Sequence, residues 1–174
     1  ASSGPTGIEN TAVGAFTYAH GTTGRSNSVY GLGAMYFNTT GSGNVALGVR
    51  SLHDNQTGNS NIAIGDSALF RSTGNFNSGI GRFSLSNTTT GTGNTALGFQ
   101  AGTSNNTGSN NTYIGFNANT LTTSLVNTTA IGAYAYTTQS NSLILGSISG
   151  LNGATNTVNV GIGLTNPFAR LHVV

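Results

Sequence analysis

The residues that could perform acid, base or metal chemistry in this chain are few and widely spaced. They are Glu9, Asp54, Asp66, His20, His53 and His172. His53 and Asp54 form the one adjacent acid and base pair, and general acid–base catalysis needs such groups within hydrogen-bonding reach. Neighbouring residues of a strand point to opposite faces. We therefore expect His53 and Asp54 to lie in a solvated loop after Leu52 and not to act together.

Two further kinds of chemistry lack the residues that they need. Glycoside hydrolysis uses two carboxylates on one face, whereas the three acids fall at different offsets in the repeat described below. Calcium-binding repeat rolls carry columns of Asp, and the three histidines show no His-x-His spacing for a metal. We predict a protein that is not an enzyme and that has no metal or other cofactor. A site assembled between several chains is the remaining catalytic alternative.

The distribution of charged and apolar residues excludes two classes of partner. Charged residues make up only 5% of the chain, and its basic residues are five arginines that are scattered along the sequence. Nucleic-acid binding needs basic residues clustered on one face, so we predict no nucleic-acid partner. No apolar run approaches the roughly 20 residues that a membrane span requires, so we predict no membrane insertion by this segment.

A five-residue motif that recurs along the chain must position every side chain. Its copies occupy residues 10–14, 27–31, 44–48, 61–65, 77–81, 94–98 and 111–115, with looser copies at 128–132, 142–146 and 159–163. The terminal glycines are separated by 17, 17, 17, 16, 17, 17, 17, 14 and 17 residues. A period of this size predicts a solenoid in which each repeat forms one coil.

The positions of the motif form columns that predict packing. The column before the terminal glycine is mostly large and aliphatic, which suits an inward-facing strand position. It holds Val13, Tyr30, Leu47, Ile64, Ile80, Leu97, Ile114, Ile131, Leu145 and Ile162. The column before it is mostly Ala or Gly and falls on the opposite face of the strand. We expect sister copies in a symmetric homo-oligomer to cover this small-residue face.

The glycine and asparagine columns have structural interpretations. The terminal glycines, among them Gly48, Gly65, Gly81, Gly98 and Gly115, allow the sharp backbone turns of a short coil. A phosphate-binding loop is excluded, because no P-loop or dinucleotide motif followed by a helix is present. The opening asparagines predict a hydrogen-bonded ladder of stacked side chains. The ladder includes Asn44, Asn61, Asn77, Asn94 and Asn111.

The repeat predicts an all-β protein, a parallel β-roll of about ten coils with a 17-residue period. Each coil has one strand in the motif, a second short strand such as 50–52 or 67–69, and a polar loop. At about 4.8 Å per coil the rod is about 45 to 50 Å long. We assign residues 1–146 to the roll and 147–174 to a terminal coil and neck or cap, followed by a further C-terminal region.

Aromatic residues outside the motif have two interpretations. Several lie one or two positions after the terminal glycine, namely Phe16, Phe83, Phe99, Phe116 and Tyr134. We expect them to pack between coils or subunits. If some are exposed, stacking on sugar rings is the alternative use.

The motif resembles the head repeats of trimeric autotransporter adhesins and the repeats of trimeric phage tail fibres. The resemblance covers about residues 10–146, and the period here is longer than is usual in adhesin heads. It implies a left-handed roll, three chains packed about a threefold axis, and projection from a surface to bind a host. Residues 158–173 also resemble a segment that often precedes a coiled coil or C-terminal chaperone in phage and bacterial surface fibres.

The leading hypothesis is therefore a homotrimeric structural and attachment module of an extracellular, cell-surface or virion fibre that binds a surface receptor or glycan. One alternative is a subunit of a self-assembling, curli-like filament. A third hypothesis is an ice-binding β-solenoid. The identity of the ligand is left open by the sequence.

Overall fold

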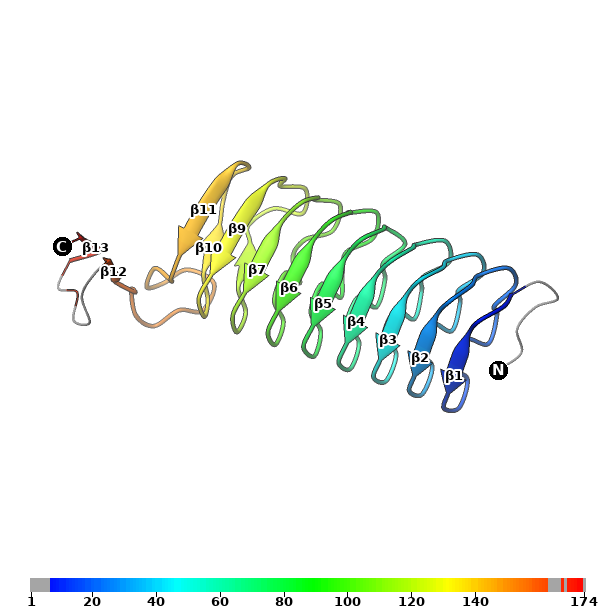
Figure 1. Ribbon diagram of the computed structural model, residues 1–174. Coiled ribbons are helices and arrows are strands. Elements are labelled where there is room, and N and C mark those ends of the chain that lie inside the picture. The colour runs from blue at the N-terminus through cyan, green and yellow to red at the C-terminus, as the bar shows by residue number, and fades with distance from the viewer. Residues whose placement is uncertain (1–6, 163–166, 168, 174) are drawn as a thin grey trace.

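The computed structural model describes residues 7–162, 167 and 169–173, except for the side chains of 161, 162, 172 and 173. In this part of the chain the protein is an all-β solenoid with no helix, and every strand pair is parallel. Figure 1 shows the coils stacked into a rod, with the strands side by side along one of its sides. The predicted all-β fold and its period of about 17 residues are confirmed.

Nine strands form the main sheet. In spatial order they are β1 (Thr11–Val13), β2 (Ser28–Tyr30), β3 (Val45–Leu47), β4 (Ile62–Ile64), β5 (Ser78–Ile80), β6 (Thr95–Leu97), β7 (Thr112–Ile114), β9 (Thr128–Ile131) and β11 (Ser142–Leu145). Equivalent residues of successive copies face each other, as in the pairs Val45 with Ile62 and Leu47 with Ile64. Each strand residue is therefore paired with the residue at the same position of the next repeat.

Two small sheets complete the described structure. β8 (Asn119–Thr120) pairs with β10 (Tyr136–Thr137), and β12 (Val160–Ile162) pairs with β13 (Leu171–Val173). The copy at 159–163 was expected to form a tenth coil of the roll, but its strand β12 lies outside the main sheet, and Gly163 is outside the described residues. Nine strands at about 4.8 Å give about 38 Å from first to last, which is shorter than predicted.

The terminal glycine of each motif turns the chain sharply out of the strand. Gly48 has φ +137°, and Gly65, Gly81, Gly98 and Gly115 have φ between +127° and +136°. A Cβ atom added to Gly48 would lie 2.5 Å from the carbonyl oxygen of Gly65 in the next coil. Both the backbone conformation and the close approach of the next coil therefore require glycine at this corner.

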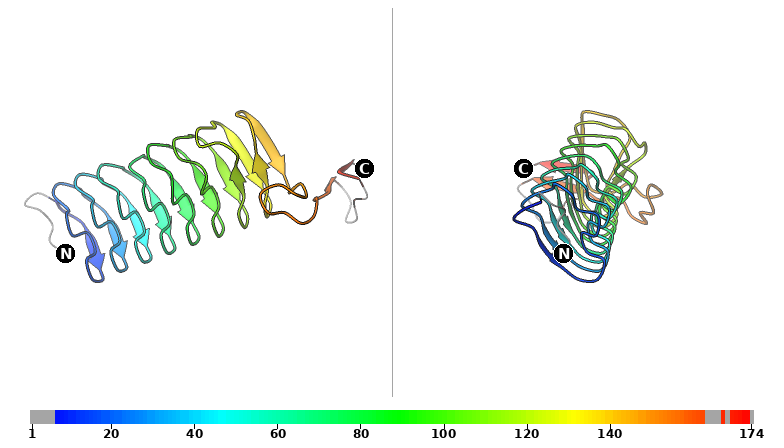
Figure 2. Two further views of the ribbon diagram at one scale, coloured as in Figure 1. Left: turned by 180° about the vertical axis from the view of Figure 1, so that it is seen from behind. Right: turned by 90° about the vertical axis from the view of Figure 1, so that its right-hand side faces the viewer.

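The expected second strand of each coil is present as β8 and β10 in two later coils, but it is wrong for 50–52 and 67–69, because both segments are turns. Arg50 and Leu52 have φ of 52° and 49°, in the left-handed region that strands do not use. The amide of Arg50 donates to Leu32 O in the previous coil, whereas that of Leu52 donates to Ala68 O in the next. The turns are thus hydrogen-bonded to both neighbouring coils without forming a ladder. Figure 2 shows the rod from behind and the stacking of the coils in end view.

The two faces of the strands are the reverse of the prediction. The column that was expected to point inward is exposed: Leu47 and Leu97 are each 48% exposed, and Ile64 and Ile114 are partly exposed. The small-residue column is buried instead. It consists of Val29, Ala46, Ala63, Gly79, Ala96, Tyr113 and Ala130, with Ala12 partly buried.

The opposite wall of the coil explains this reversal. The residue four positions after the terminal glycine is buried and usually large, as in Met35, Leu52, Leu69 and Leu85. These side chains fill the narrow interior, so that only Ala or Gly fits opposite them in most coils. The small-residue face is therefore covered by the chain itself and needs no sister copy.

Candidate interaction surfaces

The predicted asparagine ladder runs inside the rod. Each backbone amide donates to the side-chain oxygen of the preceding ladder Asn at 2.9–3.1 Å, from Asn27 to Asn111 and on to Thr128. Each side-chain amide donates to the loop carbonyl that ends its own coil, as Asn44 does to Gly58 O at 2.9 Å. The ladder therefore closes every coil and joins it to its neighbours. Asn44, Asn61, Asn77, Asn94 and Asn111 are fully buried and cannot reach a ligand.

A second buried polar column escaped the sequence analysis. It lies seven positions after the terminal glycine and consists of Asn38, Asn55, Ser72, Thr88 and Asn105. Asn55 donates to Asn38 Oδ1 at 2.8 Å and accepts from the amide of Gly58 at 2.9 Å. Aligning the loops on the glycines would have revealed this column, because each of its members is small and polar.

The outer side of the main sheet carries an exposed apolar column, which we call the aliphatic face. It consists of Val13, Tyr30, Leu47, Ile64, Ile80, Leu97, Ile114, Ile131 and Leu145. Seven of the nine are at least 38% exposed. Val45 and Ile62 widen the face at β3 and β4. Single exposed apolar residues are common in proteins, but a continuous row of this length marks an interaction surface.

Aromatic rings stack along another side of the rod. His53 is stacked between Tyr36 and Phe70, with ring centroids 5.4 and 5.0 Å apart. His20 stacks on Phe37 at 5.4 Å. Each stack joins neighbouring coils, and the coil that contains Tyr36 and Phe37 contributes a ring to both stacks.

His53 and Asp54 lie in a turn after Leu52, as expected, but the expectation that their side chains point apart is wrong. His53 Nδ1 lies 2.6 Å from Asp54 Oδ1, and both side chains are partly exposed. The rule that adjacent residues point apart applies to strands, whereas His53 and Asp54 lie in a turn. The carboxylate holds the imidazole in its place in the aromatic stack.

Three hollows follow one another along this side, and we call them together the arginine groove. The first, of about 310 Å³, is lined by Phe16, Leu32, Gly33, Tyr36, Arg50 and His53. The second, of about 230 Å³, is lined by Arg50, Ser67, Phe70, Arg71, Phe83, Ser86 and Asn87. The third, of about 430 Å³, is lined by Arg71, Asn87, Thr89, Thr103, Ser104, Asn106, Leu121 and Thr123. Arg50 thus joins the first hollow to the second, and Arg71 joins the second to the third.

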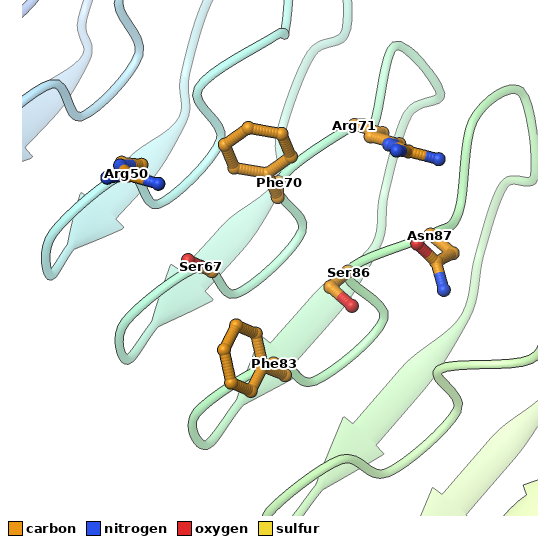
Figure 3. Close-up of a pocket in the computed structure, with 7 residues that line it drawn as sticks. All are labelled: Arg50, Ser67, Phe70, Arg71, Phe83, Ser86 and Asn87. Atoms are coloured by element: carbon orange, nitrogen blue, oxygen red, sulfur yellow. The ribbon is translucent and has the colours of Figure 1, made fainter.

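The second hollow is built from three successive coils. Figure 3 shows Phe70 and Phe83 on neighbouring coils with Ser67 and Ser86 between them, while Arg50 lies toward the preceding coil. One wall of this hollow has its own support. The Arg82 guanidinium lies 4.5 Å from the centroid of the Phe83 ring, and Arg82 Nε lies 3.3 Å from Asp66 Oδ2.

The remaining aromatic residues have mixed positions. Phe99 and Phe116 stack between coils at 5.3 Å, and Phe116 also contacts Tyr134 at 5.2 Å, so packing between coils is confirmed for these three. Phe16 is 70% exposed and has no such neighbour among the described rings. The aromatic residues themselves could be found in the sequence, but only the structure shows which of them lie on the same side of the rod.

One titratable group has a perturbed pKa. Tyr113 is fully buried, and burial raises the pKa of its hydroxyl to about 12, an effect that the nearby Thr120 and Thr128 hydroxyls reduce. Its oxygen makes no hydrogen bond of regular geometry within the described residues. The group is in the core and belongs to neither surface.

The described residues contain no cluster of three or more His, Cys, Asp or Glu side chains that could hold a metal. No helix long and apolar enough to cross a membrane occurs in the same part of the chain. Comparison of the chain with protein-family profiles, curated proteins and solved structures gives no match.

Proposed function

We propose that the chain is a structural and attachment segment of an extracellular, cell-surface or virion fibre in which three copies pack through their aliphatic faces. The observation that carries this proposal is the exposed apolar column along the nine strands of the main sheet. Parallel sheets are usually covered on both faces. One face is covered by the coil's own core, so a second copy of the chain is the natural cover for the other.

The number three and the left-handed winding rest on the resemblance of the motif to trimeric fibre repeats. A C3 arrangement suits a column that repeats at every coil, because each copy offers the same surface along the whole rod. Burying the nine side chains of the aliphatic face in each copy supplies a hydrophobic driving force of about 25 cal/mol for each Å² of apolar surface removed from water.

The proposed role is non-enzymatic. The ionisable side chains of the described residues form two close pairs, His53 with Asp54 and Arg82 with Asp66, and both stand at the surface. The arginine groove lies on a different side of the rod from the aliphatic face and would stay open in the assembly. It supplies the attachment surface, for a glycan or a receptor of the host.

Light scattering on the purified chain tests the assembly. We expect a mass three times that of one chain, independent of concentration. Leu47→Glu combined with Leu97→Glu places charges on the aliphatic face and should give folded monomers, as judged by circular dichroism. Thr90→Glu, in an exposed loop, is the matched control and should leave the trimer intact.

Three results would contradict the proposal in different ways. A monomeric wild-type chain with native circular dichroism removes the trimer. A mass that grows without limit as concentration rises favours the self-assembling filament. Thermal hysteresis in a freezing solution favours ice binding.

A further inference from the structure

The arginine groove contains side chains that the fold does not require. In the column two positions after the terminal glycine, the roll accepts Gly33, Ser67, Gln100 and Asn117. Yet the first five coils place Phe16, Arg50 and Phe83 in the same column. In the column five positions after the glycine, the roll accepts Ser86 and Thr103, but Tyr36, His53 and Phe70 precede them. Of the aromatic and arginine residues in these two columns of the roll, only Tyr134 lies outside the first five coils.

The groove has a positive charge at regular points. Arg50 and Arg71 are exposed and stand where successive hollows meet. Neither belongs to the two ion pairs of the described residues, and no acidic residue lines any of the three hollows. A guanidinium binds a carboxylate through two parallel hydrogen bonds. The charge pattern therefore fits a ligand with carboxylates at intervals.

The surfaces between the arginines suit sugar rings. Phe70 and Phe83 offer apolar ring faces in the second hollow, and Ser67, Ser86 and Asn87 offer hydrogen-bonding groups beside them. Aromatic rings provide rigid apolar surface to flat ligand faces. The third hollow is lined mainly by Thr, Ser and Asn, which can bond to hydroxyl groups.

The size of the groove points to a polymer. The hollows measure about 310, 230 and 430 Å³. Pockets that enclose a whole small ligand measure roughly 300–1,000 Å³, so the second hollow is below this range and the other two are in its lower part. Each is open and joined to the next, so each suits one or two units of a longer chain.

We propose that the arginine groove binds a linear oligosaccharide that carries carboxylates, extended along the rod axis. Its sugar rings lie against Tyr36, Phe70 and Phe83, and its carboxylates bind Arg50 and Arg71. This inference rests on the attachment role proposed above and names the chemical class of its ligand.

Calorimetric titration with defined probes tests the ligand class. The probes are a short oligogalacturonate, its fully methyl-esterified form, and polyglutamate of similar charge. We expect the free acid to bind and the uncharged ester to bind about tenfold or more weakly, a difference of about 1.4 kcal/mol. Polyglutamate has carboxylates without sugar rings and should bind as weakly as the ester. A sialylated oligosaccharide in a parallel titration distinguishes sialic acids from uronic acids as the source of the carboxylate.

Variants that copy residues from other coils keep the fold intact. Arg50→Gln reproduces Gln100, which has the same position and nearly the same φ, 55° against 52°. Phe70→Thr reproduces Thr103, and Phe83→Ser reproduces Ser67. Each should weaken binding of the acid by about tenfold. The matched control is Arg25→Gln, at an exposed arginine that lines none of the three hollows, and it should leave binding unchanged.

The outcomes separate this inference from the proposed assembly. If no carboxylated sugar binds, or if ester, polyglutamate and acid bind equally, the ligand class is wrong even when the protein is trimeric. If Arg25→Gln weakens binding as much as Arg50→Gln does, the groove is not the site. If the wild-type chain is monomeric but binds the acid through Arg50, the proposed ligand site is supported and the proposed trimer is contradicted.

Discussion

The ring of Tyr113 occupies the space that Gly102 leaves empty in the core. A Cβ atom added to Gly102 would lie 2.7 Å from Tyr113 Cδ2 and 2.7 Å from Leu85 Cδ2. Gly102 interrupts the column of large residues, and Tyr113 interrupts the column of small residues in the next coil. The two departures from the repeat therefore compensate each other across neighbouring coils.

Exchanging these two residues for the usual ones should expose their coupling. Tyr113→Ala leaves a cavity and should lower the free energy of unfolding by about 3–5 kcal/mol. Gly102→Leu overfills the core and should cost about 1–3 kcal/mol or more. The double variant restores the usual pair and should recover at least about 2 kcal/mol relative to the sum. Guanidinium titration measures all three.

The control for this exchange combines Gly102→Leu with Tyr36→Ala. Tyr36 lies several coils away, so the two losses should add within about 0.5 kcal/mol. Additive losses in the Gly102 and Tyr113 pair as well would show that the two residues do not share one space.

Removing one member of the asparagine ladder should destabilise the roll. Asn61 donates to Gly74 O at 2.8 Å and accepts from the amide of Asn77 at 2.9 Å. Asn61→Ala leaves both buried groups unpaired, and each costs about 1–3 kcal/mol. We expect a total loss of about 3 kcal/mol in thermal or denaturant unfolding. Asn87→Ala is the control, since this exposed side chain makes one hydrogen bond, to Thr103 O at 3.0 Å; an equal loss there would contradict a special role for the ladder.

The corner glycines should be far less tolerant than other glycines with positive φ. A Cβ added to Gly65 would lie 2.7 Å from the carbonyl carbon of Gly81, whereas at Gly43 the nearest neighbour is Ser60 Oγ, 3.6 Å away. Gly43→Ala should cost about 1 kcal/mol of backbone strain. Gly65→Ala must also push adjacent coils apart, and we expect it to prevent folding or to lower the midpoint of thermal unfolding much more. Equal midpoints for the two variants would refute this account.

Tyr113 should make stability depend on alkaline pH. Its folded pKa of about 12 lies above the ordinary value of 10.0, so the stabilisation is complete below pH 10 and is lost as pH rises toward 12. Between pH 8 and pH 11, Tyr113→Phe should gain roughly 1 kcal/mol over the wild type in free energy of unfolding. At pH 8 the variant should be at least as stable as the wild type, because the buried hydroxyl makes no regular hydrogen bond and an unpaired buried hydroxyl is unfavourable. A parallel decline of both proteins up to pH 11 would show that Tyr113 is not the group responsible.

The arginine groove could not be predicted from the sequence. Each of its aromatic residues was visible in the sequence, but Phe70 and Phe83 come from different columns, and their closeness depends on the path of the turn between them. The prediction that the side chains of His53 and Asp54 point apart failed for the same reason. The alternation rule assumed a strand, whereas the left-handed residues Arg50 and Leu52 make a turn that brings the two side chains together.

The spacing of the glycines and asparagines alone determined that the chain forms stacked parallel coils, because a fixed period places the same backbone geometry and the same hydrogen bonds in every repeat. Alternation within the strands also separated Leu47 from Ala46. Only the tertiary structure decided which of these two faces is inside. A strand's own sequence does not reveal the wall opposite, and here that wall carries Leu52 and Leu69, which fill the narrow core and leave the larger strand residues outside.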